Sequence, residues 1–224
     1  MGRCSSRGRA HWKTLISHLD GDQHHFTGIF NMRASIAFSL AALALTAGTA
    51  GLVAASPAIA ADAAKVAIGS KAPLFTTTGA KAGKAYKLNL ASELKKGPVV
   101  LYFFPKAFTS GCTAEAHEFA TRMDDFKKAG ATVIGLSADG IDELKKFSTE
   151  ACQSKFAVAQ ATPQMIQAYG VGLAGRPNMT GRTSMVVAPN GRVTFVHNDM
   201  DYRDHVKLTL GAVQSMAKAK AKKG

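Results

Sequence analysis

VVLYFFPKAFTSGC, residues 99–112, is the stretch that decides the predicted fold. Its first six residues are apolar and β-prone, which is typical of a central strand covered on both faces. A loop follows, and a helical pattern begins at Thr113. Cys112 is therefore expected at a helix N-terminus, where unpaired backbone N–H groups and the helix dipole favour a thiolate over a thiol. This placement predicts a thiol enzyme.

The remaining patterns alternate between strand and helix. They predict an extended leading segment and loop over 63–84, an edge strand or hairpin around Leu88 and Leu90, a strand over 99–104, a helix over 113–128, a strand over 132–136, a helix over 141–152, a short strand over 156–159, a helix over 163–169, a hairpin over 184–196 across Asn190-Gly191, and a closing helix over 206–216. This order predicts an α/β domain of thioredoxin-like architecture, in which a mixed central sheet is flanked by helices.

The N-terminal part has the pattern of a secretory signal. In residues 32–60, a basic start, an Ala- and Leu-rich run and a small-residue cleavage site follow one another, so we expect a signal peptide and a mature chain that begins at Ala61. A membrane anchor is the alternative, because the apolar run is nearly long enough to span a bilayer. Residues 1–31 lack apolar periodicity and are interpreted as a non-native upstream extension before Met32. Export predicts a periplasmic location in a Gram-negative bacterium.

Charge and length limit the classes of partner. The chain has 28 Lys and Arg against 15 Asp and Glu, a net charge of +13, and residues 218–224 form a Lys-rich tail that we interpret as a solvated, frayed end. The recognition motifs and interleaved aromatic residues of nucleic-acid-binding proteins are absent, so nucleic acid is not an expected partner. Loose association with an anionic lipid or polymer stays open. Residues 61–224 suit one domain with a single core.

Two cysteines, Cys112 and Cys152, remain after removal of the predicted signal. An even pair in an exported protein is either a permanent structural disulfide or a redox couple.

The residues around Cys112 resemble the active-site signature of a known family. Pro105-x-x-x-Thr109-x-x-Cys112, followed by Thr113-x-Glu115, is similar to the motif of the peroxiredoxins, in particular the bacterioferritin comigratory protein (Q-type) subfamily. The similarity runs from Gly69 to Ala217 and includes Gly69-x-x-Ala72-Pro73-x-Phe75 and Arg182-Thr183-Ser184-Met185. The resemblance implies a thiol-dependent peroxidase that reduces hydrogen peroxide and organic hydroperoxides.

The resemblance also implies a role for each matching residue. Cys112 would be the peroxidatic nucleophile, which becomes a sulfenic acid. Thr109 would donate to the thiolate or hold the peroxide, and Pro105 would shape the loop and shield the sulfur. Arg182 would stabilise the thiolate and the leaving oxygen, and Glu115 would orient that arginine.

Purely structural roles remain open for three of these residues. Thr109 also suits an ordinary helix cap. Glu115 also suits an acid in a first helical turn. Arg182 also suits a surface position beside the loop over 172–181.

Two positions depart from the Q-type pattern. Many members carry a second Cys five residues after the first, where this chain has His117, and many have Pro where it has Ser110. Cys152 matches the other arrangement of the subfamily, with a resolving Cys at the end of the next helix. It would form an intramolecular disulfide with Cys112, and because disulfide geometry is tight, local unfolding would be needed. The alternative is a one-Cys enzyme in which Cys152 is a spectator.

Two other classes of protein are compatible with parts of the pattern. An exported thioredoxin-like thiol-disulfide oxidoreductase needs Cys-x-x-Cys, and Thr109 occupies the first Cys position. A non-enzymatic domain stabilised by a permanent Cys112–Cys152 bridge is the other. No cofactor is expected, and no metal, because His197 and His205 lack ligand spacing. The expected partners are a peroxide and a thioredoxin-like or other thiol reductant, with the protein a monomer or weak dimer and no stable membrane insertion after signal removal.

Overall fold

A computed structural model describes residues 66–222 of the chain. The predicted upstream extension over 1–31 and the predicted signal peptide over 32–60 lie outside the described residues, as do 61–65 and 223–224. Between residues 66 and 222, no helix combines the length and the apolar character that a membrane span requires.

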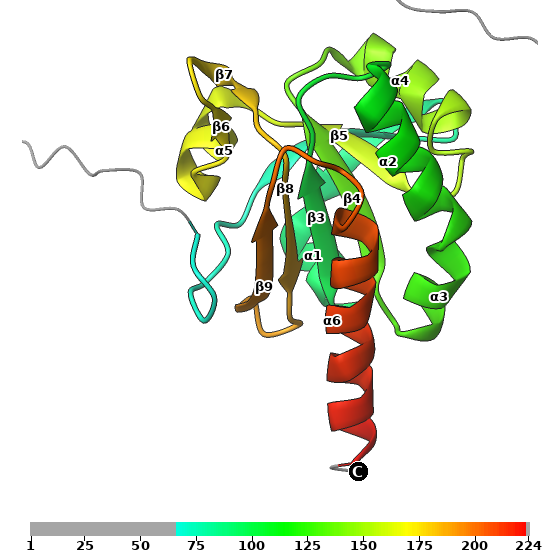
Figure 1. The fold of residues 1–224 in the computed structure, drawn as a ribbon, viewed down its shortest axis with the longest axis vertical. Coiled ribbons are helices and arrows are strands. Elements are labelled where there is room, and N and C mark those ends of the chain that lie inside the picture. Colours follow the sequence, from blue (N-terminus) through cyan, green and yellow to red (C-terminus); the bar gives the residue numbers. More distant parts are fainter. Residues whose placement is uncertain (1–65, 223–224) are drawn as a thin grey trace, which may run out of the picture. The chain divides into compact units, whose positions relative to one another are not determined.

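A seven-stranded mixed sheet forms the centre of the domain (Figure 1). Its order is β2-β1-β5-β4-β3-β8-β9, in which β3 pairs parallel with β4 and antiparallel with β8. Every residue of β3 is buried, as expected for a strand with helices on both faces. The strands are β1 (Thr76–Lys81), β2 (Lys84–Asn89), β3 (Val99–Phe103), β4 (Thr132–Ser137), β5 (Ala157–Gln160), β8 (Thr183–Val187) and β9 (Val193–Asn198).

Two layers of helices cover the two faces of the sheet. Alternate residues of β3 point to opposite faces and therefore pack into two different core clusters. Val100 and Tyr102 join the core cluster that contains the apolar residues of α2, α3, α4 and α6. Leu101 and Phe103 join the opposite cluster, with α1 and α5. The helices are α1 (Leu90–Leu94), α2 (Ser110–Thr121), α3 (Met123–Lys128), α4 (Ile141–Glu150), α5 (Pro163–Tyr169) and α6 (His205–Ala221).

The main predicted elements are confirmed. The mixed sheet with flanking helices is present, β3 is central, and β8 and β9 form the predicted hairpin. The helix over 163–169 ends at Gly170, whose φ of 62° is the left-handed conformation that glycine adopts without steric cost.

Local predictions were wrong at several boundaries. The helix predicted over 113–128 begins earlier, at Ser110, and is divided at Arg122 into α2 and α3. The predicted loop over 63–84 contains β1, which gains its stability from pairing with β2 and β5. Leu90 begins α1 because the Asn89 side chain caps that helix, accepting from Ser92 N at 2.9 Å. The loop predicted over 172–181 contains a small hairpin of β6 (Gly172–Leu173) and β7 (Arg176–Thr180).

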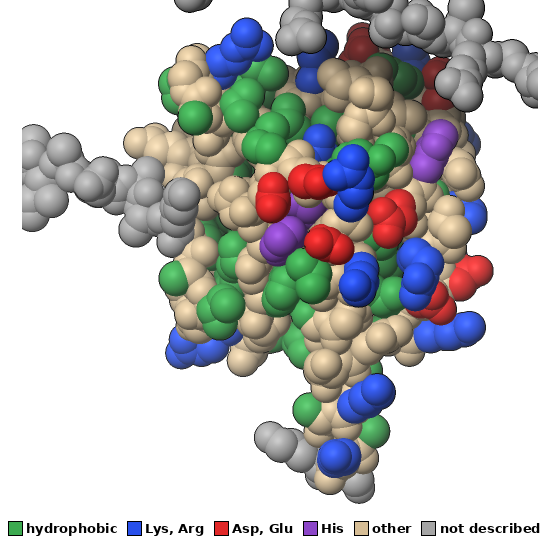
Figure 2. Space-filling view, in the orientation of Figure 1, with side chains coloured by type: hydrophobic (Ala, Val, Ile, Leu, Met, Phe, Trp, Pro, Cys, Tyr) green, Lys and Arg blue, Asp and Glu red, His purple; other side chains and the backbone are tan. Residues whose placement is uncertain are grey.

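The Lys-rich end is also more ordered than predicted. α6 continues to Ala221 with Lys218 and Lys220 in its last turn, so this part of the predicted frayed tail is helical. Alanine favours helix, and lysines interact favourably with the negative end of the helix dipole. Figure 2 shows basic side chains on this projecting end.

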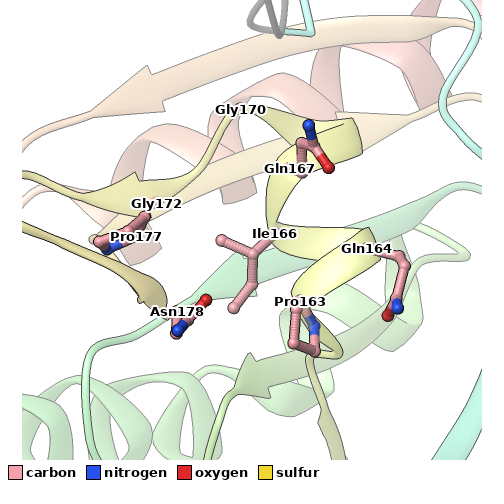
Figure 3. Close-up of a pocket in the computed structure, with 8 residues that line it drawn as sticks. All are labelled: Pro163, Gln164, Ile166, Gln167, Gly170, Gly172, Pro177 and Asn178. Carbon is pink, nitrogen blue, oxygen red and sulfur yellow. The ribbon is translucent and has the colours of Figure 1, made fainter.

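A groove of about 480 Å³ lies between α5 and the β6–β7 hairpin (Figure 3). Ile166 projects from α5 toward Pro177 and Asn178, whereas Gln164 points away from them. The lining residues are Pro163, Gln164, Ile166, Gln167, Gly170, Gly172, Pro177 and Asn178. The lining contains no acid, base or nucleophile, so a site for chemistry has to be sought elsewhere.

The packing of Tyr102 against β4 generates a stability prediction. A Cβ at Gly135 would lie 2.7 Å from the Tyr102 hydroxyl oxygen, and the Tyr102 ring is held by stacking on Phe119 with centroids 4.4 Å apart. We expect Gly135→Ala to lower the free energy of unfolding by about 1–3 kcal/mol in urea titrations, because the core has no room for the methyl group. Gly211→Ala is the matched control, since a Cβ there meets open space on α6. Equal stability of the two variants would contradict this packing.

Candidate active site

Cys112 lies in the first turn of α2, at the end of the sheet where β3 stops. Thr109 precedes the helix with extended backbone, φ −74° and ψ 149°, and its carbonyl accepts from Thr113 N at 2.9 Å. The Cys112 residue is only 1% exposed. The predicted placement of this thiol at a helix N-terminus is therefore observed, with the sulfur inside the protein surface.

Arg182 comes to the same place through strand pairing. β8 lies beside β3 with Thr183 opposite Phe103, so the residue before β8 falls next to the loop that follows β3. The Thr180 hydroxyl donates to the Phe104 carbonyl at 2.5 Å and holds the approaching chain there. Two segments that are 70 positions apart in the sequence are thus brought together at one end of the sheet.

Each of the three guanidinium nitrogens of Arg182 contacts a different partner. Nη2 lies 3.4 Å from Cys112 Sγ, Nη1 donates to Glu115 Oε2, and Nε donates to the Met200 carbonyl at 3.0 Å. Arg182 is 5% exposed and Glu115 is fully buried. A cation held in this way stabilises negative charge on the adjacent sulfur.

Glu115 is the acidic partner in this arrangement. Burial raises the pKa of the Glu115 carboxyl, while the Arg182 guanidinium acts in the opposite direction. Its Oε2 receives the Arg182 hydrogen bond, but its Oε1 is buried without a hydrogen-bond partner among the described residues. Three of the predicted site residues, Cys112, Arg182 and Glu115, are thus in one buried cluster.

Thr109 and Pro105 belong to the loop between β3 and α2. The Thr109 hydroxyl donates to the Lys106 carbonyl at 3.0 Å and makes no side-chain cap to the helix. Pro105 is half-buried at the start of the loop. Neither side chain makes a hydrogen bond to the sulfur in this conformation, so their roles in chemistry stay predictions.

Asp139 fixes this loop from the β4–α4 connection, and sequence reasoning missed it. Its Oδ2 accepts from Ala107 N at 2.6 Å and from the Ser137 hydroxyl, and its Oδ1 lies 3.8 Å from Lys106 Nζ. Only its position, two residues after a strand that ends at the active-site edge of the sheet, could have indicated a role.

Cys152 follows α4 and is fully buried, in the same core cluster as Cys112. No disulfide joins the two thiols. Burial raises the pKa of Cys152 well above its ordinary range, and the Tyr102 hydroxyl acts in the opposite direction. Gln153 and Ser154, directly after it, have φ values of 50° and 60°, a left-handed conformation that is costly for residues with a side chain.

His205 is a buried neighbour of the cluster that sequence reasoning left without a role. Its Nε2 lies 2.9 Å from the Asp199 carbonyl, its Nδ1 lies 2.8 Å from the Ser184 hydroxyl, and Nδ1 is 3.8 Å from Glu115 Oε1. Figure 2 shows acidic, basic and His side chains gathered over this start of α6. His117, in contrast, is exposed on α2. No group of three potential metal ligands occurs within residues 66–222.

Because His205 is buried, we predict how the free energy of unfolding depends on pH. Burial is the main cause that lowers its pKa from 6.5 to about 4. The unfolded chain therefore takes up a proton first, and the stability contribution of neutral His205 is fully present above pH 6.5 and is lost as the pH falls toward about 4. We expect unfolding curves to show a loss on the order of 3 kcal/mol over this interval, and His205→Gln to remove that component. His117→Gln, at an exposed position, is the control, and an unchanged pH dependence in His205→Gln would contradict the assignment.

Comparison with known proteins places this chain in a family. Residues 68–196 match the model of the AhpC/TSA family. The chain is 34% identical over 153 residues to chloroplastic peroxiredoxin Q of Oryza sativa subsp. japonica, covering 68% of this chain and 69% of that protein. It is 29% identical to peroxiredoxin Bcp of Escherichia coli, covering 53% of this chain and 80% of that protein.

A solved structure agrees with this placement. The crystal structure of peroxidoxin BcpB from Mycobacterium tuberculosis superposes with a TM-score of 0.60 and 26% identity, covering 66% of this chain and 97% of that one. The chain belongs to the AhpC/TSA family and is a peroxiredoxin of the peroxiredoxin Q and Bcp type.

Proposed function

We propose that Cys112 is the nucleophile of this thiol-dependent peroxidase. Its thiolate attacks one oxygen of hydrogen peroxide or an organic hydroperoxide, the O–O bond breaks, and the sulfur becomes a sulfenic acid. The other oxygen leaves and takes a proton to give water or an alcohol. The observation that carries this proposal is the 3.4 Å approach of Arg182 Nη2 to Cys112 Sγ in the first turn of α2.

Arg182 and Glu115 are proposed to act as one unit in this step. The guanidinium stabilises the thiolate before the reaction and the negative charge on the departing oxygen during it. Glu115 and the Met200 carbonyl restrict the guanidinium, so that Nη2 remains directed at the sulfur. Preorganised donors of this kind require no reorganisation when charge develops.

Thr109 and Pro105 are proposed to form the peroxide-binding loop. The Thr109 hydroxyl, now bonded to Lys106 O, can rotate about χ1 to donate to a bound peroxide. Pro105 has a fixed φ and no N–H, so it supplies a rigid wall without a competing donor. The Asp139 hydrogen bond to Ala107 N holds the loop between these two residues.

Cys152 is proposed to resolve the sulfenic acid. Its thiol attacks Cys112, an S–S bond forms, and water is released. Because both residues are buried, the first turn of α2 and the segment after α4 have to open. The left-handed backbone at Gln153 and Ser154 supports such opening, since each residue stores roughly 1–2 kcal/mol that unfolding releases.

A one-Cys route is the second candidate, and the complete burial of Cys152 favours it. A thiol whose pKa is raised by burial is a weak nucleophile until it is exposed. In this route an external thiol reduces the Cys112 sulfenic acid directly. In either route the reductant is proposed to be a thioredoxin-like protein or another thiol donor. The enzyme is proposed to be a monomer or weak dimer, and analytical ultracentrifugation would measure its mass in solution.

Substitution of each cysteine separates these routes. We expect Cys112→Ser to abolish fast peroxide consumption in stopped-flow assays, because no other described thiol has a charged donor beside it. Cys152→Ser should keep the first oxidation at a similar rate. Intact mass after one equivalent of peroxide should show loss of two hydrogens in the native protein and a gain of one oxygen in Cys152→Ser. A gain of oxygen in both proteins would exclude the Cys152 route and leave the one-Cys enzyme.

Export to the periplasm is proposed from the pattern of residues 32–60 alone. The plant relatives are named chloroplastic, so membership of the family does not indicate one compartment. Expression of the full chain in a Gram-negative host should yield a periplasmic product whose mass corresponds to a start at Ala61. A cytoplasmic product that retains residues 32–60 would contradict export.

A further inference from the structure

The hydrogen bonds of His205 fix which of its ring nitrogens carries the proton. The Asp199 carbonyl can only accept, so His205 Nε2 at 2.9 Å has to carry the proton that it donates. In the neutral ring Nδ1 is then an acceptor, and it receives the Ser184 hydroxyl at 2.8 Å. The low pKa of about 4 agrees with a neutral ring near neutral pH.

This tautomer determines the hydrogen bonding of Glu115. Oε1 of Glu115 is buried, lacks a hydrogen-bond partner among the described residues, and lies 3.8 Å from His205 Nδ1. Because Nδ1 carries no proton, the ring offers Oε1 no donor. The carboxyl group therefore interacts with Arg182, through Oε2.

His205 also stabilises the backbone to which Arg182 binds. His205 Nε2 donates to the carbonyl of Asp199, and Arg182 Nε donates to the carbonyl of the next residue, Met200, at 3.0 Å. The imidazole and the guanidinium are thus anchored on consecutive carbonyl groups of one segment. Movement of this segment would displace Arg182 from one of its three partners.

From these contacts we infer that His205 is a positioning residue for Arg182: its Nε2–H holds the Asp199 carbonyl beside the Met200 carbonyl that Arg182 uses, and its unprotonated Nδ1 leaves Glu115 bonded to Arg182. This inference rests on the proposed function of Cys112 and extends it to a residue that touches neither the sulfur nor the peroxide. A proton on Nδ1 would give Glu115 a competing donor and weaken its hold on Arg182.

The other groups around the ring are consistent with a neutral His205. Glu115 faces it from α2 and His197 from β9, with the two imidazole centroids 4.5 Å apart, and the charge of Arg182 acts on it from the chain before β8. The charges of His197 and Arg182 lower the pKa of His205 further, while the Asp199 backbone and carboxylate raise it, and burial is the largest effect. Burial and the neighbouring positive charges therefore favour a neutral ring, in which Nδ1 is a hydrogen-bond acceptor.

A double-mutant cycle tests the inference on the intact protein. His205→Phe keeps a planar ring but removes both ring nitrogens, and with them the hydrogen bond that anchors the Asp199 carbonyl beside Met200. We expect the rate constant for Cys112 oxidation by hydrogen peroxide to fall roughly tenfold. In an Arg182→Met background the same change should have no further effect, because the residue through which His205 acts is gone. His205→Gln, which can still donate to the Asp199 carbonyl, should recover part of the rate. An equal fold-change in both backgrounds would overturn the inference, as would an unchanged rate in His205→Phe.

Thr209→Val is the matched control for the cycle. Thr209 is buried one turn further along α6, and its hydroxyl donates only to backbone carbonyls of that helix, at 2.7 and 3.1 Å. It should lose stability and keep the oxidation rate. If His205→Phe does not fold, Ser184→Ala replaces it, with an expected fall of a few-fold in the native background and none with Arg182→Met.

A second measurement does not depend on activity. Nitrogen-15 NMR of the imidazole in the reduced native protein should show the Nε2–H tautomer at neutral pH, and an Nδ1–H or doubly protonated ring would overturn the inference. The outcomes also distinguish the proposed function of Cys112 from the proposed role of His205. If the native protein fails to consume peroxide, the proposed function is wrong. If it consumes peroxide in a Cys112-dependent way but the cycle is additive, only the role of His205 is wrong.

Discussion

The buried Arg182–Glu115 contact is the interaction on which the rest of the site depends. Removing a guanidinium and a carboxylate from water costs several kcal/mol per ion, and that cost is offset only if the charged groups are well paired. Here the guanidinium has three partners, a carboxylate, a backbone carbonyl and the Cys112 sulfur. Burial of Arg182 therefore lowers the stability of the fold, but it holds a cation directly beside a thiol. Peroxide reduction requires such a cation.

Strand pairing in the sheet brings Arg182 close to Cys112 and Glu115. Antiparallel pairing of β3 with β8 places the start of one strand beside the end of the other, so the residue before β8 meets the loop and helix that follow β3. The same edge receives Asp139 from the end of β4, which anchors the loop before α2. Three successive neighbours in the sheet therefore supply the cysteine, the arginine and the loop anchor, and the surrounding helices exclude water from the cluster.

The fold was largely predictable because its signals are local. The apolar run of β3, the Asn-Gly hairpin between β8 and β9 and the glycine after α5 each mark their element within a few residues. β1 was missed because its pairing with β2 and β5 stabilises it more than its own composition does. The candidate cysteine and arginine followed from a motif. Asp139 contacts Ala107, and His205 contacts Ser184 and Glu115, and a single sequence carries no local signal for contacts between such separated segments.

The most direct test of this account is the second-order rate constant for oxidation of Cys112 by hydrogen peroxide in Arg182→Lys, compared with the native protein. Lysine keeps the positive charge but cannot reach the sulfur, Glu115 and the Met200 carbonyl at once, because its three donors sit on one compact nitrogen and not on a rigid planar fork. The account predicts a fall of roughly a hundredfold or more, with Cys112 still present and the protein folded. A rate constant in the variant within about threefold of the native value would contradict the claim that the fixed guanidinium makes this thiol reactive.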